Sequence, residues 1–304
     1  MRRALAAATA LLAGGCVAAA DGAGQAGDVA VVQPVPVGVR SPAIATPPAA
    51  GPTTFLFSGE LTQGGWIRGQ APTGTVAARL GVLELALDDE GRFFAAFDRD
   101  AGPLATLRAT LRDGAVIESP LAIAPRDWAI ERVNVARTAG HPSQAFMRIR
   151  QPELERIAAA RAVDTGSEGW RQDFVWPVTG RISGQFGSQR IYRGEPGSYH
   201  SGIDIATGES GTLYVAPAAG VVVLAAEDPF SLEGKLLVID HGMGLNSAFL
   251  HSSALLVGEG ERVQQGQPIG RIGATGRASG PHLHWSLTWR DARLDPLLFT
   301  GAMG

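Results

Sequence analysis

Short apolar runs separated by glycine-rich turns recur along most of the chain. In residues 105–112 apolar and polar side chains alternate, so every second residue from Leu107 to Leu111 faces one side. The dipeptide Asp113-Gly114 follows and favours a two-residue type I′ turn into a second run at 115–119. This segment is predicted to form a β-hairpin.

Further strand candidates precede this hairpin. Residues 54–57 form one apolar run, and residues 82–87 and 93–97 form two more. The acidic stretch 88–91 separates the last two runs, which predicts a second hairpin with a solvated tip. We therefore expect a small antiparallel β domain over residues 54–150, and none of its residues suggests catalysis.

A single helix is predicted to follow this domain, over residues 151–168. It is expected to open at Gln151, because Pro152 and an acidic residue suit the first turn of a helix. The glycine-bounded stretch 166–169 should end it. The expected apolar stripe consists of Leu154, Ile157 and Ala158.

The C-terminal part returns to strand patterns with many glycines. Apolar or β-branched runs occupy residues 220–224, 236–239, 270–273 and 282–287, and no long helical pattern interrupts them. We predict an all-β chain: a small N-terminal β domain, a linking helix, and a C-terminal β-sheet domain over residues 169–304.

The N-terminus has the pattern of an export signal over residues 1–20. A basic start precedes the apolar run 4–13, which is far shorter than the roughly 20 residues of a membrane span. Two processing routes stay open: Cys16 as the lipidated residue of a lipoprotein, or cleavage after the small residues 18–20. Residues 21–53 then form a flexible linker. Either route predicts an exported protein, periplasmic or lipid-anchored in the cell envelope.

Composition narrows the chemistry. A length of 304 residues allows about two domains. The net charge of −3 argues against a nucleic-acid partner, and the single cysteine excludes both an intrachain disulfide and a cysteine-rich zinc finger. Of the six histidines, only His141 precedes position 200. The candidate catalytic and metal-binding histidines therefore lie mainly in the C-terminal part.

Two histidine motifs suggest a metal site there. On a strand, the spacing of His200 and Asp204 places both side chains on one face, and His282 and His284 also share a face. Two histidines and one aspartate with an open fourth position are typical of catalytic zinc. If only one histidine of the second motif binds, the other lies within reach of a water at the metal. His251 lies between the motifs and joins the candidates.

The same region contains eight short motifs in a characteristic order. They occupy residues 176–180, 183–187, 200–206, 216–222, 238–242, 249–251, 263–267 and 273–284. In this order they resemble the lysostaphin/LytM-type zinc metallopeptidases, the M23 family. The resemblance covers about 40% of the chain, from residue 176 to residue 296.

The resemblance implies roles for five residues. His200, Asp204 and His284 would hold one Zn²⁺ per chain, and His251 and His282 would be the two catalytic histidines. One histidine would take up a proton and the other would hydrogen-bond the oxyanion, in an order that the sequence leaves open. As a departure, Phe249 stands where many members have Tyr, which would remove a hydroxyl near the site.

Other polar residues are expected to lie outside the site. Three polar residues are candidates for binding an anionic peptide but are expected to be solvated surface groups. Two histidines are expected to be structural or incidental. They are Arg271, Arg277 and Asn246 in the first group and His241 and His141 in the second.

The resemblance implies a zinc-dependent endopeptidase that hydrolyses stem-peptide cross-links of peptidoglycan. In a Gram-negative host, the bond expected is that between D-alanine and meso-diaminopimelate. Two alternatives remain: a LytM-type non-hydrolytic regulator that activates a cell-wall amidase or joins a division complex, and a module that only binds peptidoglycan. Degenerate members of the family lose metal ligands, whereas this chain retains all five key positions.

Overall fold

The computed structural model describes residues 51–136 and 143–303. Strands in five sheets predominate within these ranges, so the predicted all-β fold is confirmed. No helix in the described residues is both long and apolar enough to cross a membrane. The predicted export signal with Cys16, most of the predicted linker, and His141 lie outside the described residues.

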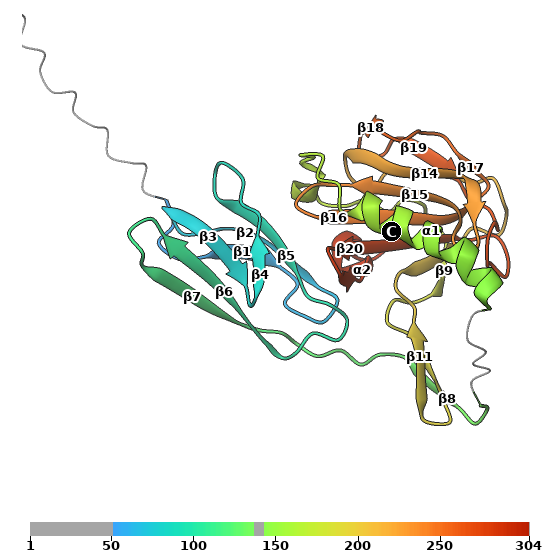
Figure 1. Cartoon of the computed structure of the whole chain (residues 1–304), viewed down its shortest axis with the longest axis horizontal. Coiled ribbons are helices and arrows are strands. Elements are labelled where there is room, and N and C mark those ends of the chain that lie inside the picture. Colours follow the sequence, from blue (N-terminus) through green and yellow to red (C-terminus); the bar gives the residue numbers. More distant parts are fainter. Residues whose placement is uncertain (1–50, 137–142, 304) are drawn as a thin grey trace, which may run out of the picture. The chain divides into compact units, whose positions relative to one another are not determined.

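Two antiparallel sheets form the N-terminal part (Figure 1). The first has the order β1-β2-β5 and the second the order β4-β3-β6-β7. Their strands are β1 (Leu56–Gly59), β2 (Trp66–Gln70), β3 (Thr75–Leu80), β4 (Leu83–Leu85), β5 (Arg92–Ala96), β6 (Leu104–Leu111) and β7 (Val116–Ala122).

The hairpin predicted from alternation is present as β6 and β7, and Leu107 and Ala109 are fully buried. Its turn is one residue longer than predicted. Leu111 donates its backbone N–H to the Ala115 carbonyl at 2.8 Å, and Gly114 has a φ of +86°. Glycine tolerates this left-handed conformation, which closes a three-residue loop with a bulge.

The second predicted hairpin, over residues 82–97, is wrong. Strand β4 pairs with β3, and β5 pairs with β2. Between them, Asp88 accepts backbone N–H groups of Glu90 and Arg92 at 2.9 and 2.7 Å and accepts an Arg171 hydrogen bond at 2.6 Å. Hydrogen bonds to Asp88 therefore fix the conformation of the acidic turn, which is not a freely solvated tip.

An antiparallel eight-stranded sheet dominates the C-terminal part, with the order β18-β14-β15-β16-β20-β12-β9 and β21 beside β20. Its strands are β9 (Arg181–Gly184), β12 (Ile203–Ala206), β14 (Gly220–Phe230), β15 (Gly234–Asp240), β16 (Leu245–Ser252), β18 (Arg262–Val263), β20 (Leu283–Trp289) and β21 (Ala292–Leu294).

Two three-stranded sheets accompany it. One has the order β13-β19-β17 and the other β11-β10-β8, in which β8 runs parallel to β10. The remaining elements are β8 (Ile130–Val133), β10 (Gln189–Tyr192), β11 (Glu195–Tyr199), β13 (Leu213–Val215), β17 (Ala254–Leu255), β19 (Pro268–Arg271), the 3-10 turn η1 (Gly169–Arg171) and the short helix α2 (Leu297–Thr300). The domain boundaries set by the predicted helix stay a prediction.

The predicted linking helix is present but begins seven residues earlier, as α1 (Gln144–Arg161). The Ser143 hydroxyl oxygen accepts the Phe146 N–H at 3.1 Å and caps the helix. Pro152 therefore lies inside the helix instead of in its first turn. Proline favours the first turn of a helix, but it marks the start only where no cap precedes it. Here the Ser143 cap begins the helix earlier.

The buried face of α1 also differs from the predicted stripe. Leu154 is exposed, and the buried positions are Arg150, Glu153, Ile157 and Ala160. The helix lies across one face of the large sheet, over β14 and β15 (Figure 1). The buried face thus includes Ile157 of the predicted stripe together with two ionised side chains that the stripe did not include.

The large sheet has an apolar core on each face. Under α1, the aliphatic side chains of β14, β15 and β16 form one cluster: Leu224, Ala226, Leu236, Val238 and Ala248. The opposite face buries a larger set that includes Ile203, Ile205, Phe249, Leu283 and Trp285. Because side chains alternate along each strand, these two clusters define which residues face α1.

Candidate metal and catalytic site

Three predicted ligands converge beside the α1 face of the sheet. Asp204 on β12 and His284 on β20 are directly opposite each other in the antiparallel register, and His200 precedes β12. His200 Nε2 lies 3.1 Å from Asp204 Oδ1 and 3.1 Å from His284 Nδ1, and the last two atoms are 2.9 Å apart. The three atoms form a nearly equilateral triangle of metal-ligand type.

This donor set fits a tetrahedral divalent metal. With bonds of roughly 2.0–2.1 Å, tetrahedral ligand atoms lie about 3.3 Å apart, close to the observed spacing. His200 Nδ1 lies 3.1 Å from the Gln185 carbonyl, which only accepts hydrogen bonds. The proton therefore sits on Nδ1, and the Nε2 lone pair is free to face Asp204 and His284.

His200 reaches the site from the irregular segment between β11 and β12, contrary to the predicted strand. Strand β12 begins only at Ile203, because the backbone of His200 pairs elsewhere. Its carbonyl accepts the Gly187 N–H at 2.8 Å, and its N–H donates to the Ser188 carbonyl at 2.9 Å. The shared-face argument was therefore wrong for His200, although the side chain still reaches Asp204.

Two glycines leave room for these side chains. A Cβ on Gly184 would lie 2.3 Å from Asp204 Oδ2, and one on Gly202 would lie 2.8 Å from His284 Nε2. Contacts this short are essentially never seen. Neither glycine has a left-handed φ, so the demand at both positions is for space around the ligands.

His251 and His282 complete the group, with ring centres 4.9 Å apart. His251 Nδ1 lies 2.8 Å from the Thr275 carbonyl, and His282 Nδ1 lies 2.8 Å from the Gly280 carbonyl. Both rings must therefore donate from Nδ1, so that Nε2 is an acceptor when the ring is neutral and a donor when it is protonated. His282 Nε2 is 3.7 Å from Asp204 Oδ1. All five predicted site residues thus lie together.

The pKa shifts differ among the side chains of the site. Burial alone would raise the pKa of Asp204, but hydrogen bonds and charge from His200 and His284 outweigh it and lower the pKa well below its ordinary value. Burial lowers the pKa of His251 and of His284, whereas Asp204 outweighs burial and raises the pKa of His200. A neutral His251 near pH 7 is able to accept a proton.

The backbone of His251 is unusual and was not foreseen. Leu250 is the cross-strand neighbour of His284 and packs in the cluster under α1, so strict alternation would send His251 to the opposite face. Instead the pairing of β15 and β16 shifts beside Leu236, and His251 has a φ of +67°. This bulge redirects the side chain toward the site.

Phe249 lies on that opposite face and not near the site. It is fully buried and stacks on Tyr214, with ring centres 5.4 Å apart. The expectation that a missing hydroxyl here changes the site is therefore wrong. A hydroxyl at position 249 would enter the core, since the bulge lies beyond it in the strand.

The other weighed residues divide between core and surface. Asn246 is buried, contrary to its predicted surface position, and the Arg271 guanidinium donates to the Gly211 carbonyl at 2.8 Å. His241 is fully buried: its Nδ1 lies 2.8 Å from the Ala219 carbonyl and its Nε2 2.7 Å from Ser247 Oγ. His241 is thus a structural residue of the strand end, as predicted.

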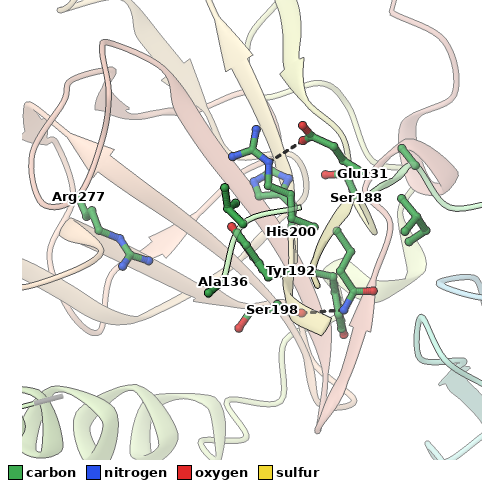
Figure 2. Close-up of a pocket in the computed structure, with 14 residues that line it drawn as sticks. Glu131, Ala136, Ser188, Tyr192, Ser198, His200 and Arg277 are labelled. Atoms are coloured by element: carbon green, nitrogen blue, oxygen red, sulfur yellow. Dashed lines mark hydrogen bonds and ion pairs between the residues drawn. The ribbon is translucent and has the colours of Figure 1, made fainter. Parts of the chain in front are cut away.

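A pocket of about 1210 Å³ adjoins the metal-ligand group at His200. Figure 2 shows Arg277 on one side, with Glu131, Tyr192 and Ser198 among the other lining residues. Arg277 is exposed as predicted, but it lines this pocket together with His200. The pocket therefore offers a charged and polar surface beside the ligands.

Sequence reasoning missed the groups that orient the imidazoles. These are the backbone carbonyls of Gln185, Thr275 and Gly280. A backbone carbonyl has no side-chain signature, so its position depends on the fold alone. The residues that hold the bulge at His251 had no signal either.

The fold and the side chains define a β-sheet domain in which two histidines and one aspartate have metal-ligand geometry and two further histidines lie beside them. Comparison with known proteins supports the same class, because residues 198–296 match Peptidase family M23. Residues 198–296 are therefore a domain of the peptidase M23 type, as the sequence motifs predicted.

Relatives of known description include both enzymes and activators. The chain is 40% identical over 114 residues to the peptidoglycan DD-endopeptidase ShyA of Vibrio cholerae, and 34% identical over 130 residues to the murein hydrolase activator NlpD of Escherichia coli. These matches cover 36% and 43% of this chain, but only 25% and 31% of the two relatives.

Structural similarity extends over more of the chain. A crystal structure from Pseudomonas aeruginosa, described as peptidase M23, matches with a TM-score of 0.60 and 26% identity. The match covers 80% of this chain and 96% of that chain. The likeness therefore includes parts of the fold outside the peptidase domain.

Proposed function

We propose that this chain is a zinc-dependent endopeptidase that hydrolyses peptide cross-links of peptidoglycan in the cell envelope. The observation that carries the proposal is the convergence of five side chains. His200, Asp204 and His284 present three ligand atoms to one point, while the rings of His251 and His282 lie beside them, with ring centres 4.9 Å apart.

The proposed mechanism assigns each side chain a task. His200 Nε2, Asp204 Oδ1 and His284 Nδ1 would hold one zinc ion. Zinc supplies Lewis-acid polarisation of a peptide carbonyl and lowers the pKa of water to roughly 7. One of His251 and His282 takes a proton from the attacking water at Nε2 and later delivers it to the leaving amine. The other, in its doubly protonated form, donates a hydrogen bond from Nε2 to the developing oxyanion.

The environment of His251 favours it as the proton acceptor. Its pKa is lowered, chiefly by burial, so the ring is neutral at neutral pH. The Thr275 carbonyl holds the Nδ1 proton and orients the ring. Protonation at Nε2 would be stabilised by the nearby Asp204 carboxylate, which raises the pKa of His251 against the effect of burial.

The substrate and location rest on the relatives and on the N-terminal pattern. The similarity to ShyA, a peptidoglycan DD-endopeptidase, supports peptidoglycan stem peptides as substrate. Export to the periplasm, or anchoring through Cys16, agrees with such a substrate, which lies outside the cytoplasm. The adjacent pocket, lined by Arg277 and Glu131, would suit a peptide bearing both amino and carboxylate groups.

A second candidate function is activation of a cell-wall amidase. The similarity to the murein hydrolase activator NlpD favours it. The complete set of metal-ligand and acceptor side chains favours the enzyme, because a protein that acts only through binding needs no converging histidine nitrogens. An amidase partner is compatible with either function.

One experiment separates the two. Purified sacculi are incubated with the zinc-loaded chain alone, with its His282→Ala variant, and with each protein plus a cell-wall amidase. The enzyme proposal predicts new peptide termini from the wild-type chain alone, and their loss in the variant or with a chelator. Release of material only in the presence of amidase, equal for both proteins, would support the activator instead.

A further inference from the structure

We propose that Arg150 of helix α1 is a positioning residue for His251, acting through Glu233 in the turn between β14 and β15. The inference rests on the proposed function, because it takes His251 as a catalytic residue. It assigns to a helix outside the sheet a part in aiming that histidine.

His251 adopts a backbone conformation that its neighbours must maintain. Its φ of +67° is disfavoured for a residue with a Cβ and persists only where the surrounding structure enforces it. The His251 N–H donates to the Glu233 carbonyl at 2.8 Å, and its ring nitrogen Nδ1 donates to the Thr275 carbonyl at 2.8 Å. The position of Glu233 therefore determines where the bulge places the imidazole.

Helix α1 holds the side chain of Glu233. Arg150 Nη1 lies 2.6 Å from Glu233 Oε2, and Nη2 lies 2.7 Å from Oε1, so the guanidinium makes a two-pronged pair with the carboxylate. Such pairs fix orientation as well as distance, which a lysine ammonium does not. The carbonyl of the same residue holds His251, so a single residue connects helix and histidine.

A second contact from the helix secures the same turn. Glu153 accepts the Ser231 N–H and the Ser231 hydroxyl at 2.6 Å each, and it also pairs with Arg150 at 2.9 Å. Leu232, between the two held residues, accepts the Arg277 N–H at 2.9 Å through its carbonyl. The turn therefore connects helix α1 both to His251 and to the loop that precedes His282.

Burial makes this cluster of ion pairs effective. Arg150 and Glu153 are each 8% exposed, and the Glu233 side chain is 15% exposed. Buried charges are strongly destabilised when a partner is removed. Arg150 thus cannot be lost without movement of the turn, since Glu233 would seek water or another donor.

The cluster is separate from the metal ligands. Within the described residues, no hydrogen bond or ion pair joins this cluster to the metal-ligand group. Of the three ligands, His200 precedes β12, Asp204 lies on β12 and His284 lies on β20. Loosening the turn is therefore expected to disturb His251 while zinc binding is retained.

The test follows the His251 amide by hydrogen exchange in the zinc-loaded chain. The variants are Arg150→Ala, Arg150→Lys and Glu233→Gln, with Arg148→Ala on the exposed side of the same helix as the control. The Ile205 amide on β12 is the internal reference. We expect the His251 amide to exchange about tenfold faster than in the wild type in Arg150→Ala, less so in Arg150→Lys, and at the wild-type rate in Arg148→Ala.

Cleavage kinetics give the second readout. In the Arg150 and Glu233 variants kcat is expected to fall by about tenfold, with KM and zinc content within twofold of wild type. If Arg150→Ala does not fold, Arg150→Lys and Glu233→Gln decide the question. Unchanged His251 exchange in these variants would overturn the proposal, and so would equal acceleration at His251 and Ile205, which indicates general destabilisation. Exchange requires no substrate, so a wild-type chain without peptidase activity would refute the proposed function separately.

Discussion

Replacing Gly184 by alanine tests the geometry of the metal-ligand group. The new Cβ would lie 2.3 Å from Asp204 Oδ2 and 2.9 Å from its Cγ, where ordinary contacts begin at 3.4 Å. The carboxylate must therefore move by about 1 Å, several times the tolerance of roughly 0.2 Å for a metal-ligand distance. Asp204 Oδ1 lies directly against His200 and His284, so its displacement changes the spacing of the three ligand atoms.

The expected effect falls on zinc binding more than on folding. We expect zinc affinity to drop by at least about tenfold, or about 1.4 kcal/mol, because misplacement of groups around a metal typically has this effect. The free energy of unfolding of the metal-free chain should change by less than about 1 kcal/mol. The carboxylate is a side-chain end that can rotate away, and alanine at an ordinary φ slightly restricts the unfolded chain.

The assay is zinc titration in competition with a chromophoric chelator, together with urea unfolding of the metal-free protein. Gly258→Ala is the matched control, because its Cβ would meet nothing within 4 Å and its φ is ordinary. Wild-type zinc affinity in Gly184→Ala would refute the assignment of Asp204 as a ligand in this geometry.

Three further predictions concern the catalytic histidine, a buried histidine and the core. His251→Ala should lower cleavage by about 10²–10⁴-fold and leave zinc affinity within twofold, as measured by product analysis and zinc titration; retained cleavage would exclude His251 from the proton transfer. Burial lowers the pKa of His241 to about 4, below the ordinary 6.5 of the unfolded chain, so its neutral form stabilises the fold. That contribution is fully present above pH 6.5 and is lost as the pH falls toward 4, by about 3 kcal/mol; urea unfolding across this range should show a shallower pH dependence in His241→Gln, and parallel curves would contradict the assignment. Tyr214→Phe removes the hydroxyl that lies 2.7 Å from Ser252 Oγ in the core and should cost about 1–2 kcal/mol in urea unfolding, whereas an unchanged midpoint would mean that Ser252 finds another partner.

Local patterns predicted local structure well. The alternation around Leu107 correctly identified a strand with a buried face, because burial of alternate residues is a property of the segment itself. The hairpin over residues 82–97 failed for the opposite reason. Strands β4 and β5 are neighbours in sequence but pair with β3 and β2, and the choice of partner depends on packing of the whole sheet.

In the candidate site, the identity of the residues could be predicted from the sequence, whereas their orientation could not. The two histidine motifs and the family resemblance together predicted five site residues, and the structure brings all five together. Their orientation was beyond the sequence. His251 reaches the site only because a bulge with a left-handed φ redirects it, and His200 reaches it from the irregular segment before β12. Both conformations depend on hydrogen bonds to residues distant in the chain. The burial of Arg150 could not be predicted, because a buried arginine on a helix looks like a surface residue in the sequence.

Hydrolysis of a peptide bond of peptidoglycan, with zinc held by His200, Asp204 and His284, is the function proposed for this chain. The most direct measurement is mass spectrometry of a purified cross-linked muropeptide dimer after incubation with the zinc-loaded chain in water enriched in ¹⁸O. The proposed hydrolysis predicts conversion of the dimer to two monomers, with one ¹⁸O atom in the newly formed carboxyl group. A dimer that stays intact, while one zinc ion per chain is bound, would contradict it.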